Sequence, residues 1–236
     1  MLFIMNPNQV MIGTLIETKT NTFYNEDVRE VIKWIPDESI DLIVSDPPYL
    51  INYQSNRRVA TEKFQHMQGD TDPELISWYF KECYRTLKNN TSCYIFCSWK
   101  TVDFFKVEFE KHFNLKNILV WDKGIWGSGD LKGSYGPQHE FILYGHKGRD
   151  TLRHKRYPDI IKGFNKVPSA KLLHPAQKPT HLLCHLIQNS SNVEDLVFDG
   201  FAGIGSTGVA CKHTNRKFLM CEINKEYYEI GANLLK

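Results

Sequence analysis

The chain has 236 residues, of which 42% are hydrophobic and 24% are charged, and its formal net charge is +2. This composition is that of an ordinary globular protein, so disordered, collagen-like and coiled-coil proteins are excluded. No apolar run approaches the roughly 18 residues that a membrane helix needs, so we expect no membrane partner. We expect one domain, residues 1–236, long enough to bury a core without disulfides or a metal ion.

Strand-like and helix-like runs alternate along the chain. Apolar, β-branched or aromatic runs predict strands at 21–25, 41–45, 92–97, 118–121, 140–144, 196–199 and 217–221. Helices are predicted at 27–35, 73–87, 101–112, 180–189, 206–212 and 225–235, with Asp27, Asp72 and Thr101 as N-caps. This alternation predicts an α/β fold with a mostly parallel sheet and helices on both faces.

The six cysteines predict a reduced, cytoplasmic protein. None of them forms a Cys-x-x-Cys pair, and several lie in apolar runs. Cys93 and Cys97 lie four residues apart on a predicted strand, about 13 Å from each other, which is too far to share a metal ion. We therefore expect buried thiols and no metal site.

Two polar or glycine-rich stretches, 50–71 and 123–138, fit no regular element and suggest functional loops. Between Lys147 and Lys178 there are nine Lys or Arg residues and two acids, which makes this window +7 and the rest of the chain −5. A local basic block of this kind indicates either contact with a polyanion or a solvated loop.

A glycine-rich loop follows the predicted strand 196–199. Asp199 ends the strand, Gly203 and Gly205 form a Gly-x-Gly turn, and a helix opens at about Ser206. Such a turn admits a ligand close to the backbone, and the helix start favours a carboxylate. Glu222 ends the next strand, where an acid can accept hydrogen bonds from ribose hydroxyls. The pattern indicates a nucleoside cofactor, although helix–strand packing also uses glycine.

A second motif, Asp46-Pro47-Pro48-Tyr49, follows the predicted strand 41–45. The two prolines lack N–H groups, so the carbonyl groups beside them are left to accept hydrogen bonds from outside the loop. A carboxylate, a rigid carbonyl and an aromatic face suit a planar ring with an exocyclic amine. The alternative is a strand that ends in prolines, with Tyr49 as packing.

The sequence Asp46-Pro-Pro-Tyr49 together with Phe201-x-Gly-x-Gly205 resembles the S-adenosylmethionine-dependent DNA amino-methyltransferases. In this family the Asp-Pro-Pro-Tyr form points to adenine N6, whereas Ser-Pro-Pro-Tyr is more usual for cytosine N4. The tetrad precedes the cofactor loop, which is the circularly permuted order of the β class. Five further segments match the family, namely 23–27, 35–46, 120–123, 139–143 and 174–179. The resemblance spans about residues 21–233.

The resemblance implies a Rossmann-like, seven-stranded mixed sheet with one antiparallel strand near an edge. The permuted order places strand 21–25 beside the C-terminal helix. It also implies that S-adenosylmethionine binds between residues from both ends of the chain. Asp27 would contact the adenine amine of the cofactor, and Glu222 would contact its ribose. The methionine portion would lie against Phe201, Gly203 and Gly205, with its carboxylate between His174 and Lys178. Asp46 and Asp199 would line the same site. Gly200 stands where the family usually has proline, which we expect to loosen the turn.

The resemblance also implies the reaction. Asp46 and the Pro47 carbonyl would accept hydrogen bonds from the amine of a flipped-out adenine, which would stack on Tyr49, without a metal ion or a covalent enzyme intermediate. Region 124–171 would recognise the target, with Trp126, Tyr135 and His154 as wedges or as loop anchors. The expected phosphate contacts are Arg57, Arg58, Lys147, Arg149, Arg153, Lys155 and Arg156.

Three other functions remain open. The first is methylation of cytosine N4 in DNA, and the second is methylation of RNA, whose enzymes usually carry the cofactor loop first. The third is a catalytically silent protein that binds nucleic acid on this scaffold. The class also suggests two protein partners, a second copy of the chain and a cognate restriction nuclease.

Overall fold

The computed structural model describes residues 20–51, 71–127, 132–168 and 177–236. Within these ranges one sheet has eight strands in the order β1-β8-β7-β2-β3-β5-β4-β6. The strands are β1 (Thr22–Tyr24), β2 (Ile40–Ser45), β3 (Leu87–Cys97), β4 (Asn114–Asp122), β5 (His139–Lys147), β6 (Ile160–Ile161), β7 (Leu196–Asp199) and β8 (Lys217–Cys221). β5 is antiparallel to both of its neighbours, and the other pairs are parallel.

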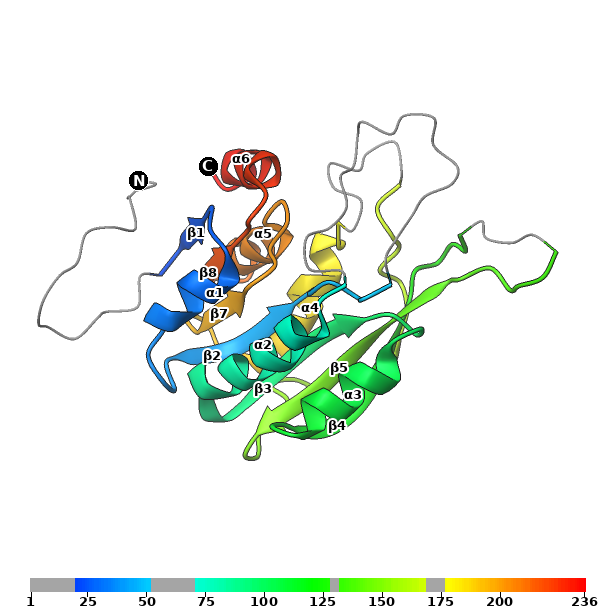
Figure 1. The fold of residues 1–236 in the computed structure, drawn as a ribbon, viewed down its shortest axis with the longest axis horizontal. Coiled ribbons are helices and arrows are strands. Elements are labelled where there is room, and N and C mark those ends of the chain that lie inside the picture. Colours follow the sequence, from blue (N-terminus) through cyan, green and yellow to red (C-terminus); the bar gives the residue numbers. More distant parts are fainter. Residues whose placement is uncertain (1–19, 52–70, 128–131, 169–176) are drawn as a thin grey trace, which may run out of the picture.

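Helices cover both faces of this sheet, as the alternation of elements predicts (Figure 1). The helices are α1 (Val28–Val31), α2 (Pro73–Thr86), α3 (Val102–Glu110), α4 (Thr180–Ser190), α5 (Ser206–His213) and α6 (Lys225–Leu234), with a 3-10 turn at Ile32–Trp34. In β3, Cys93 and Ile95 pack with α1, α2 and α3, whereas Tyr94 and Phe96 pack with α4. This alternation is the two-residue period of a strand that is buried on both faces.

Local sequence explains where α2 begins and which face it buries. The Asp72 carboxylate accepts a hydrogen bond from the Leu75 N–H at 3.0 Å, and Pro73 occupies the first turn, where its missing N–H costs nothing. Buried side chains then recur at helical spacing, namely Ile76, Tyr79, Phe80 and Cys83. Tyr79 therefore points into the core, toward the ends of the central strands.

The central strands β2 and β7 lie side by side, and the chain leaves them in opposite directions, from β2 toward β3 and from β7 toward β8. Such a reversal opens a crevice at the carboxyl ends of the strands, where open α/β sheets bind ligands. The two motifs singled out in the sequence follow these two strands. Ser45 joins the strand ends, because its hydroxyl donates to the Asp199 carboxylate at 3.0 Å.

The circular permutation is visible in the packing of the chain's first described strand. β1 pairs with β8, in register from Thr22 with Leu219 to Tyr24 with Cys221. The ring of Phe23 lies 4.8 Å from that of Tyr228 in α6, so β1 packs beside the C-terminal helix as predicted (Figure 1).

Two local predictions differ from the structure. The sheet has eight strands rather than seven, because Ile160 and Ile161 pair with Val120 and Trp121 as the two-residue strand β6. The Thr101 hydroxyl does not cap α3 but donates to the Tyr49 carbonyl at 2.8 Å. A two-residue strand has no sequence pattern of its own, and the partner of Thr101 is distant in sequence.

Other predictions are confirmed. Asp27 and Asp72 cap α1 and α2. All six cysteines are free thiols and five of them are buried.

None of the helices in the described part of the chain has the length and apolarity needed to cross a membrane.

Candidate active site

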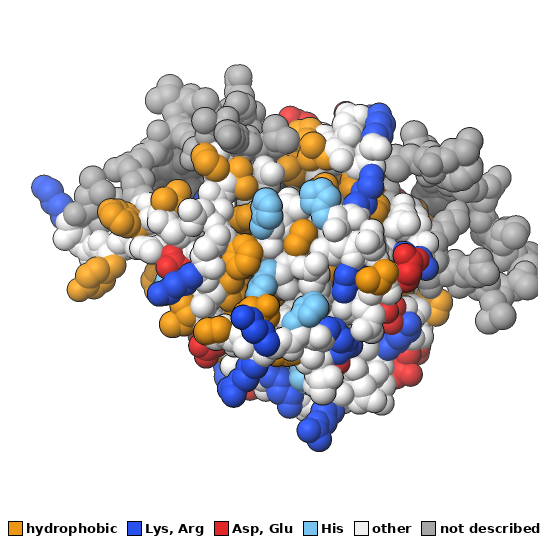
Figure 2. Space-filling view, turned by 180° about the vertical axis from the view of Figure 1, so that it is seen from behind, with side chains coloured by type: hydrophobic (Ala, Val, Ile, Leu, Met, Phe, Trp, Pro, Cys, Tyr) orange, Lys and Arg blue, Asp and Glu red, His pale blue; other side chains and the backbone are white. Residues whose placement is uncertain are grey.

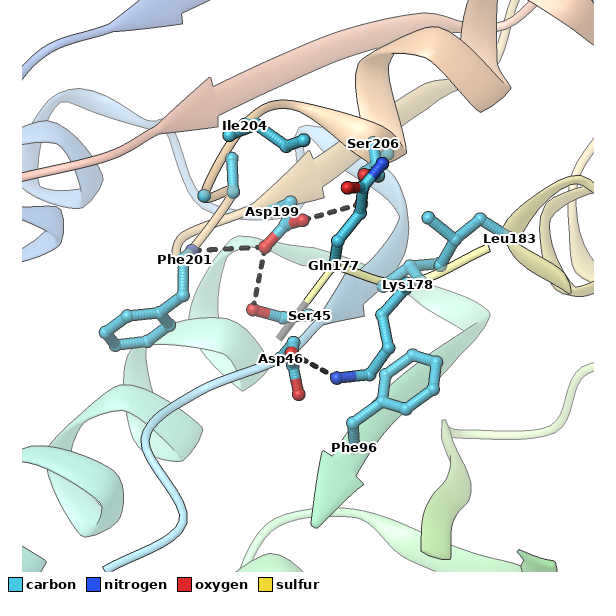
Figure 3. Close-up of a pocket in the computed structure, with 14 residues that line it drawn as sticks. Ser45, Asp46, Phe96, Gln177, Lys178, Leu183, Asp199, Phe201, Ile204 and Ser206 are labelled. Carbon is cyan, nitrogen blue, oxygen red and sulfur yellow. Dashed lines mark hydrogen bonds and ion pairs between the residues drawn. The ribbon is translucent and has the colours of Figure 1, made fainter. Parts of the chain in front are cut away.

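Two side chains of the tetrad are joined by a short hydrogen bond at the end of β2. The Tyr49 hydroxyl donates to Oδ1 of Asp46 at 2.5 Å. The ammonium of Lys178 contacts Oδ2 of the same carboxylate and lies 3.2 Å from the Tyr49 hydroxyl. Figure 3 shows Lys178 reaching toward Asp46 along the ring of Phe96, with its Nζ 4.9 Å from the ring centre.

Glu140, at the start of β5, completes this cluster, although no role is predicted for it from the sequence. Its Oε2 lies 3.4 Å from Nζ of Lys178 and 3.2 Å from the Tyr49 hydroxyl, whose proton points to the nearer Asp46. Its Oε1 lies 3.4 Å from Nζ of Lys123. The signal was available, because Glu140 and Lys123 both fall in segments that match the family, but only the fold shows that they meet the tetrad.

Burial and mutual contacts shift the pKa values of Asp46, Glu140 and Lys178 in this cluster. Burial raises the pKa of Asp46, and the Lys178 ammonium offsets this effect only in part. Burial also acts to raise the pKa of Glu140, but Lys178 and Lys123 outweigh it, so the net shift is downward. Burial acts to lower the pKa of Lys178, yet the Asp46 and Glu140 carboxylates raise it overall. Relative to their ordinary values, the pKa of Asp46 is therefore shifted up and the pKa of Glu140 is shifted down.

The glycine-rich loop lies next to this cluster, at the end of β7. Gly203 and Gly205 have positive φ angles of 54° and 74°, which only glycine adopts without strain. Glu222, after β8, holds the loop: its Oε2 accepts from the Gly203 N–H and its Oε1 from the Asn224 N–H, both at 2.8 Å. Each carboxylate oxygen has a second lone pair, so Glu222 can still accept from hydroxyl groups.

Asp199 shapes the loop from within. Its Oδ1 accepts from the Ser45 hydroxyl at 3.0 Å and the Phe201 N–H at 3.1 Å, and its Oδ2 accepts from the Thr207 hydroxyl at 2.6 Å. Burial raises the pKa of Asp199 to about 6. These partners all belong to the chain itself, so the contact of Asp199 with a cofactor stays a prediction.

Asp46 of the tetrad and the glycine-rich loop line one pocket (Figure 3). From one side it is lined by Asp46, Phe96 and Lys178, and from the other by Phe201 and Gly203. The structure therefore brings together residues that are about 155 positions apart in the chain. The pocket opens at the switch point of the sheet, where a ligand is expected.

The structure leaves the cofactor contacts predicted for Asp27, His174 and Lys178 untested. Asp27 follows β1 on the same edge as Glu222, where its carboxylate accepts from the Arg29 N–H at 2.8 Å and pairs with the Arg29 guanidinium at 2.7 Å. Its contact with the cofactor adenine stays a prediction. His174 lies outside the described residues. Lys178 was expected beside the cofactor carboxylate, but its ammonium here pairs with Asp46 and Glu140.

The predicted phosphate contact by Lys147 is wrong. Lys147 is buried, and its ammonium donates to the carbonyls of Tyr84 and Leu87 at 3.0 and 2.9 Å and pairs with Glu38 at 3.0 Å. Because β5 runs antiparallel to β3, Lys147 and the following Arg149 lie at the sheet edge opposite Asp46. Counting charges along the chain could not reveal this reversal.

The remaining basic residues divide into paired and exposed groups. Arg153 pairs with Asp150 at 2.7 Å, and its N–H donates to the Asn189 carbonyl in the last turn of α4 at 2.8 Å. Lys155 and Arg156 are exposed. Tyr157, which follows them, packs its ring 4.6 Å from that of His185 in α4. Figure 2 shows the side opposite to the view of Figure 1, where Lys, Arg and His side chains gather. Arg57 and Arg58 lie outside the described residues.

Comparison with known proteins identifies the family. The model of the DNA methylase family matches residues 40–233. The chain is 30% identical to the DNA adenine methyltransferase YhdJ of Escherichia coli (strain K12), over 94% of this chain and 85% of that protein. The structure resembles the complex of M1.HpyAVI with S-adenosylmethionine, with a TM-score of 0.71, 25% identity, and coverage of 91% of this chain and 98% of that one.

A third similarity concerns the fold alone. The cytosine-N4-specific PvuII DNA methyltransferase superposes with a TM-score of 0.74 at 17% identity, over 91% of this chain and 86% of that one. The fold is therefore also that of an enzyme that acts on cytosine N4. The family model covers most of the sequence, including the tetrad, β5 and the glycine-rich loop, and this chain belongs to the DNA methylase family.

Proposed function

We propose that this protein transfers a methyl group from S-adenosylmethionine to N6 of an adenine in DNA. The observation that carries the proposal is the pocket that Asp46, which is hydrogen-bonded to Tyr49, lines together with the glycine-rich loop. Of the relatives named above, YhdJ is described as a DNA adenine methyltransferase, and M1.HpyAVI is described in complex with S-adenosylmethionine. The Asp-Pro-Pro-Tyr form of the tetrad supports adenine over cytosine.

The residues around the loop fit the proposed cofactor. Gly203 lines the pocket, and so do Ser206 and Thr207 in the first turn of α5, which begins directly after Gly205. A helix start of this kind would favour the carboxylate of the cofactor. Glu222 retains lone pairs for two ribose hydroxyls. Bound there, S-adenosylmethionine would supply an electrophilic methyl group on its sulfonium sulfur. Phe201 and Ile204 would shield it from water.

The tetrad would activate the nucleophile. The exocyclic amine of adenine is weakly nucleophilic because its lone pair is conjugated into the ring. Hydrogen bonds to the Asp46 carboxylate and the Pro47 carbonyl would favour a pyramidal nitrogen and stabilise the positive charge that develops as it attacks. After transfer the nitrogen must lose a proton, and Asp46, whose pKa burial raises, is the acceptor already hydrogen-bonded to it.

Lys178 must leave Asp46 for this arrangement to form. Its ammonium contacts Oδ2 of Asp46, a position that the amine of the target base needs. Glu140 lies 3.4 Å from the same ammonium and offers a second carboxylate, so the lysine charge would stay paired while the base enters. We therefore assign Glu140 and Lys178 to the substrate side of the pocket.

DNA would approach the edge of the sheet that holds the pocket. At this edge the β4–β5 hairpin continues as an arm that protrudes from the body (Figure 1). The Lys123 N–H donates to the Gln138 carbonyl at 2.9 Å and the Gly127 N–H to the Pro137 carbonyl at 3.0 Å. Trp126 on this arm is 72% exposed and Tyr135 is fully exposed, which suits contact with a groove. The arm belongs to the proposed target-recognition region, 124–171.

Of the predicted phosphate contacts, Lys155 and Arg156 are exposed and lie away from the sheet edge that holds Lys147 and Arg149, so we retain them as candidates. We expect the double variant Lys155→Gln/Arg156→Gln to bind DNA more weakly at low salt and to reduce the slope of log K against log salt by up to about 2. The measurement is a salt titration of DNA affinity by fluorescence anisotropy.

The matched control for this variant is Arg149→Gln, which removes an exposed charge from the opposite sheet edge. We expect it to leave the salt slope unchanged. Equal slopes for the double variant and the wild type would exclude the basic block from the DNA interface.

The proposal also covers the cellular setting. Action on DNA in the cytoplasm, a homodimer and a cognate restriction nuclease remain parts of the proposal. Size-exclusion chromatography with light scattering, with and without DNA, tests the dimer.

A labelled-methyl assay tests the proposed function. The protein is incubated with S-adenosylmethionine carrying a tritiated methyl group and with separate DNA and RNA substrates. We expect acid-insoluble label on DNA that DNase releases, and none on RNA. Label on RNA alone would make the chain an RNA methyltransferase. Cofactor binding without label on either substrate, or no binding at all, would favour a silent scaffold.

A further inference from the structure

We propose that Tyr79, on helix α2, is a positioning residue that connects the glycine-rich loop to the strand end that carries Asp46. This inference rests on the proposed function, because it concerns how the same pocket is held in shape. Tyr79 is completely buried and lines no part of the pocket, so it would act through its neighbours.

A continuous chain of buried hydrogen bonds runs through Tyr79. The Gly200 N–H donates to the Tyr79 hydroxyl at 3.3 Å. The Tyr79 hydroxyl donates to the Ser45 hydroxyl at 2.9 Å, and Ser45 donates to Oδ1 of Asp199 at 3.0 Å. The donors and acceptors of these three bonds are mutually consistent, and each hydroxyl both donates and accepts. Buried chains of this kind fix geometry, because a broken link leaves a polar group unsatisfied.

Packing around Gly200 explains why glycine stands in this position. A Cβ atom added to Gly200 would lie 2.7 Å from Cγ2 of Val28 and 2.8 Å from both Cε2 and the hydroxyl of Tyr79. Proline would also remove the N–H that donates to Tyr79. The expectation that glycine loosens this turn is therefore wrong: the turn is held by Tyr79, which occupies the space that a larger residue would need.

Tyr79 also contacts the next residue of the loop. The rings of Tyr79 and Phe201 meet edge to face, with centres 4.9 Å apart and an angle of 79° between their planes. Phe201 lines the pocket, and its N–H donates to Asp199. One side chain thus holds the backbone of Gly200, the ring of Phe201 and the hydroxyl of Ser45. Since Ser45 directly precedes Asp46, the cofactor loop and the tetrad share one support.

The substitution Tyr79→Phe tests this inference, since it removes the hydroxyl and keeps the ring. We expect the Kd and the KM for S-adenosylmethionine to rise about tenfold, while the KM for DNA changes less than twofold. Isothermal titration calorimetry gives the Kd, and initial rates with one substrate varied at a time give the two KM values. The matched control is Tyr84→Phe, a half-buried tyrosine of the same helix whose ring packs against Phe113. We expect that variant to behave as the wild type does.

A second variant separates positioning from general stability. Ser45→Ala breaks the same chain at its middle link, so the double variant Ser45→Ala/Tyr79→Phe should lose little more cofactor affinity than either single variant. Independent effects on two structural residues would instead multiply.

Three results would overturn the inference. The first is an unchanged Kd in Tyr79→Phe, and the second is multiplicative losses in the double variant. The third is a rise in both KM values together. If the wild type itself binds no S-adenosylmethionine, the proposed function fails first, and the role of Tyr79 fails with it.

Discussion

Replacing Asp46 with alanine is expected to lower kcat for methyl transfer by on the order of 1,000-fold, because the developing charge on the amine loses its main acceptor. The Kd for S-adenosylmethionine should change little, since the loop contacts of Glu222 and Asp199 do not involve Asp46. The fold should tolerate the change. Lys178, which loses one carboxylate, keeps Glu140 at 3.4 Å, so its buried charge stays paired. Single-turnover rates and calorimetry on the same preparation measure both quantities.

The control for this variant is Asp37→Ala, which removes an exposed carboxylate that pairs with Arg85 far from the pocket. It should retain wild-type turnover. Turnover by Asp46→Ala within tenfold of the wild type would contradict the assigned role, and equal losses of cofactor binding and rate would make Asp46 a structural residue.

Replacing Glu222 with alanine is expected to raise the Kd for S-adenosylmethionine about 100-fold. Two losses of hydrogen bonds both weaken cofactor binding. The ribose would lose hydrogen bonds to a charged acceptor, and the Gly203 and Asn224 N–H groups would lose their partner, so the loop would be less ordered before binding. Saturating cofactor should restore much of kcat, since Glu222 does not touch the base.

Two comparisons sharpen this test. Glu222→Gln keeps one acceptor oxygen and should lose less affinity than alanine does. Glu226→Ala, an exposed residue in the first turn of α6, should lose none. A Kd in Glu222→Ala within threefold of the wild type would remove Glu222 from the cofactor site.

Residues whose chemistry depends on local pattern could be predicted from the sequence. The tetrad follows a run of buried strand residues, and the glycine-rich loop follows another, so the motifs could be placed at the ends of strands β2 and β7. The resemblance to the family then placed strand 21–25 by the C-terminal helix, which the contact between the rings of Phe23 and Tyr228 confirms. The helix caps at Asp27 and Asp72 were equally local.

Contacts across the sheet could not be predicted. Glu140 meets Lys178 and Tyr49 only because β5 runs antiparallel to β3, which brings the first residues of β5 to the sheet edge that holds Asp46. The same reversal takes Lys147 to the far edge, where it is buried against backbone carbonyls rather than free for phosphate. The support that Tyr79 gives to Gly200 depends on how α2 packs over the strand ends. Strand direction and helix packing are properties of the whole fold.

The most direct test of the proposed reaction identifies the methylated nucleoside. DNA that lacks adenine methylation is incubated with the protein and S-adenosylmethionine, digested to nucleosides and analysed by mass spectrometry. The account predicts N6-methyladenine, absent when Asp46→Ala replaces the wild type. N4-methylcytosine as the product would contradict it, because the pocket would then act on cytosine in spite of Asp46.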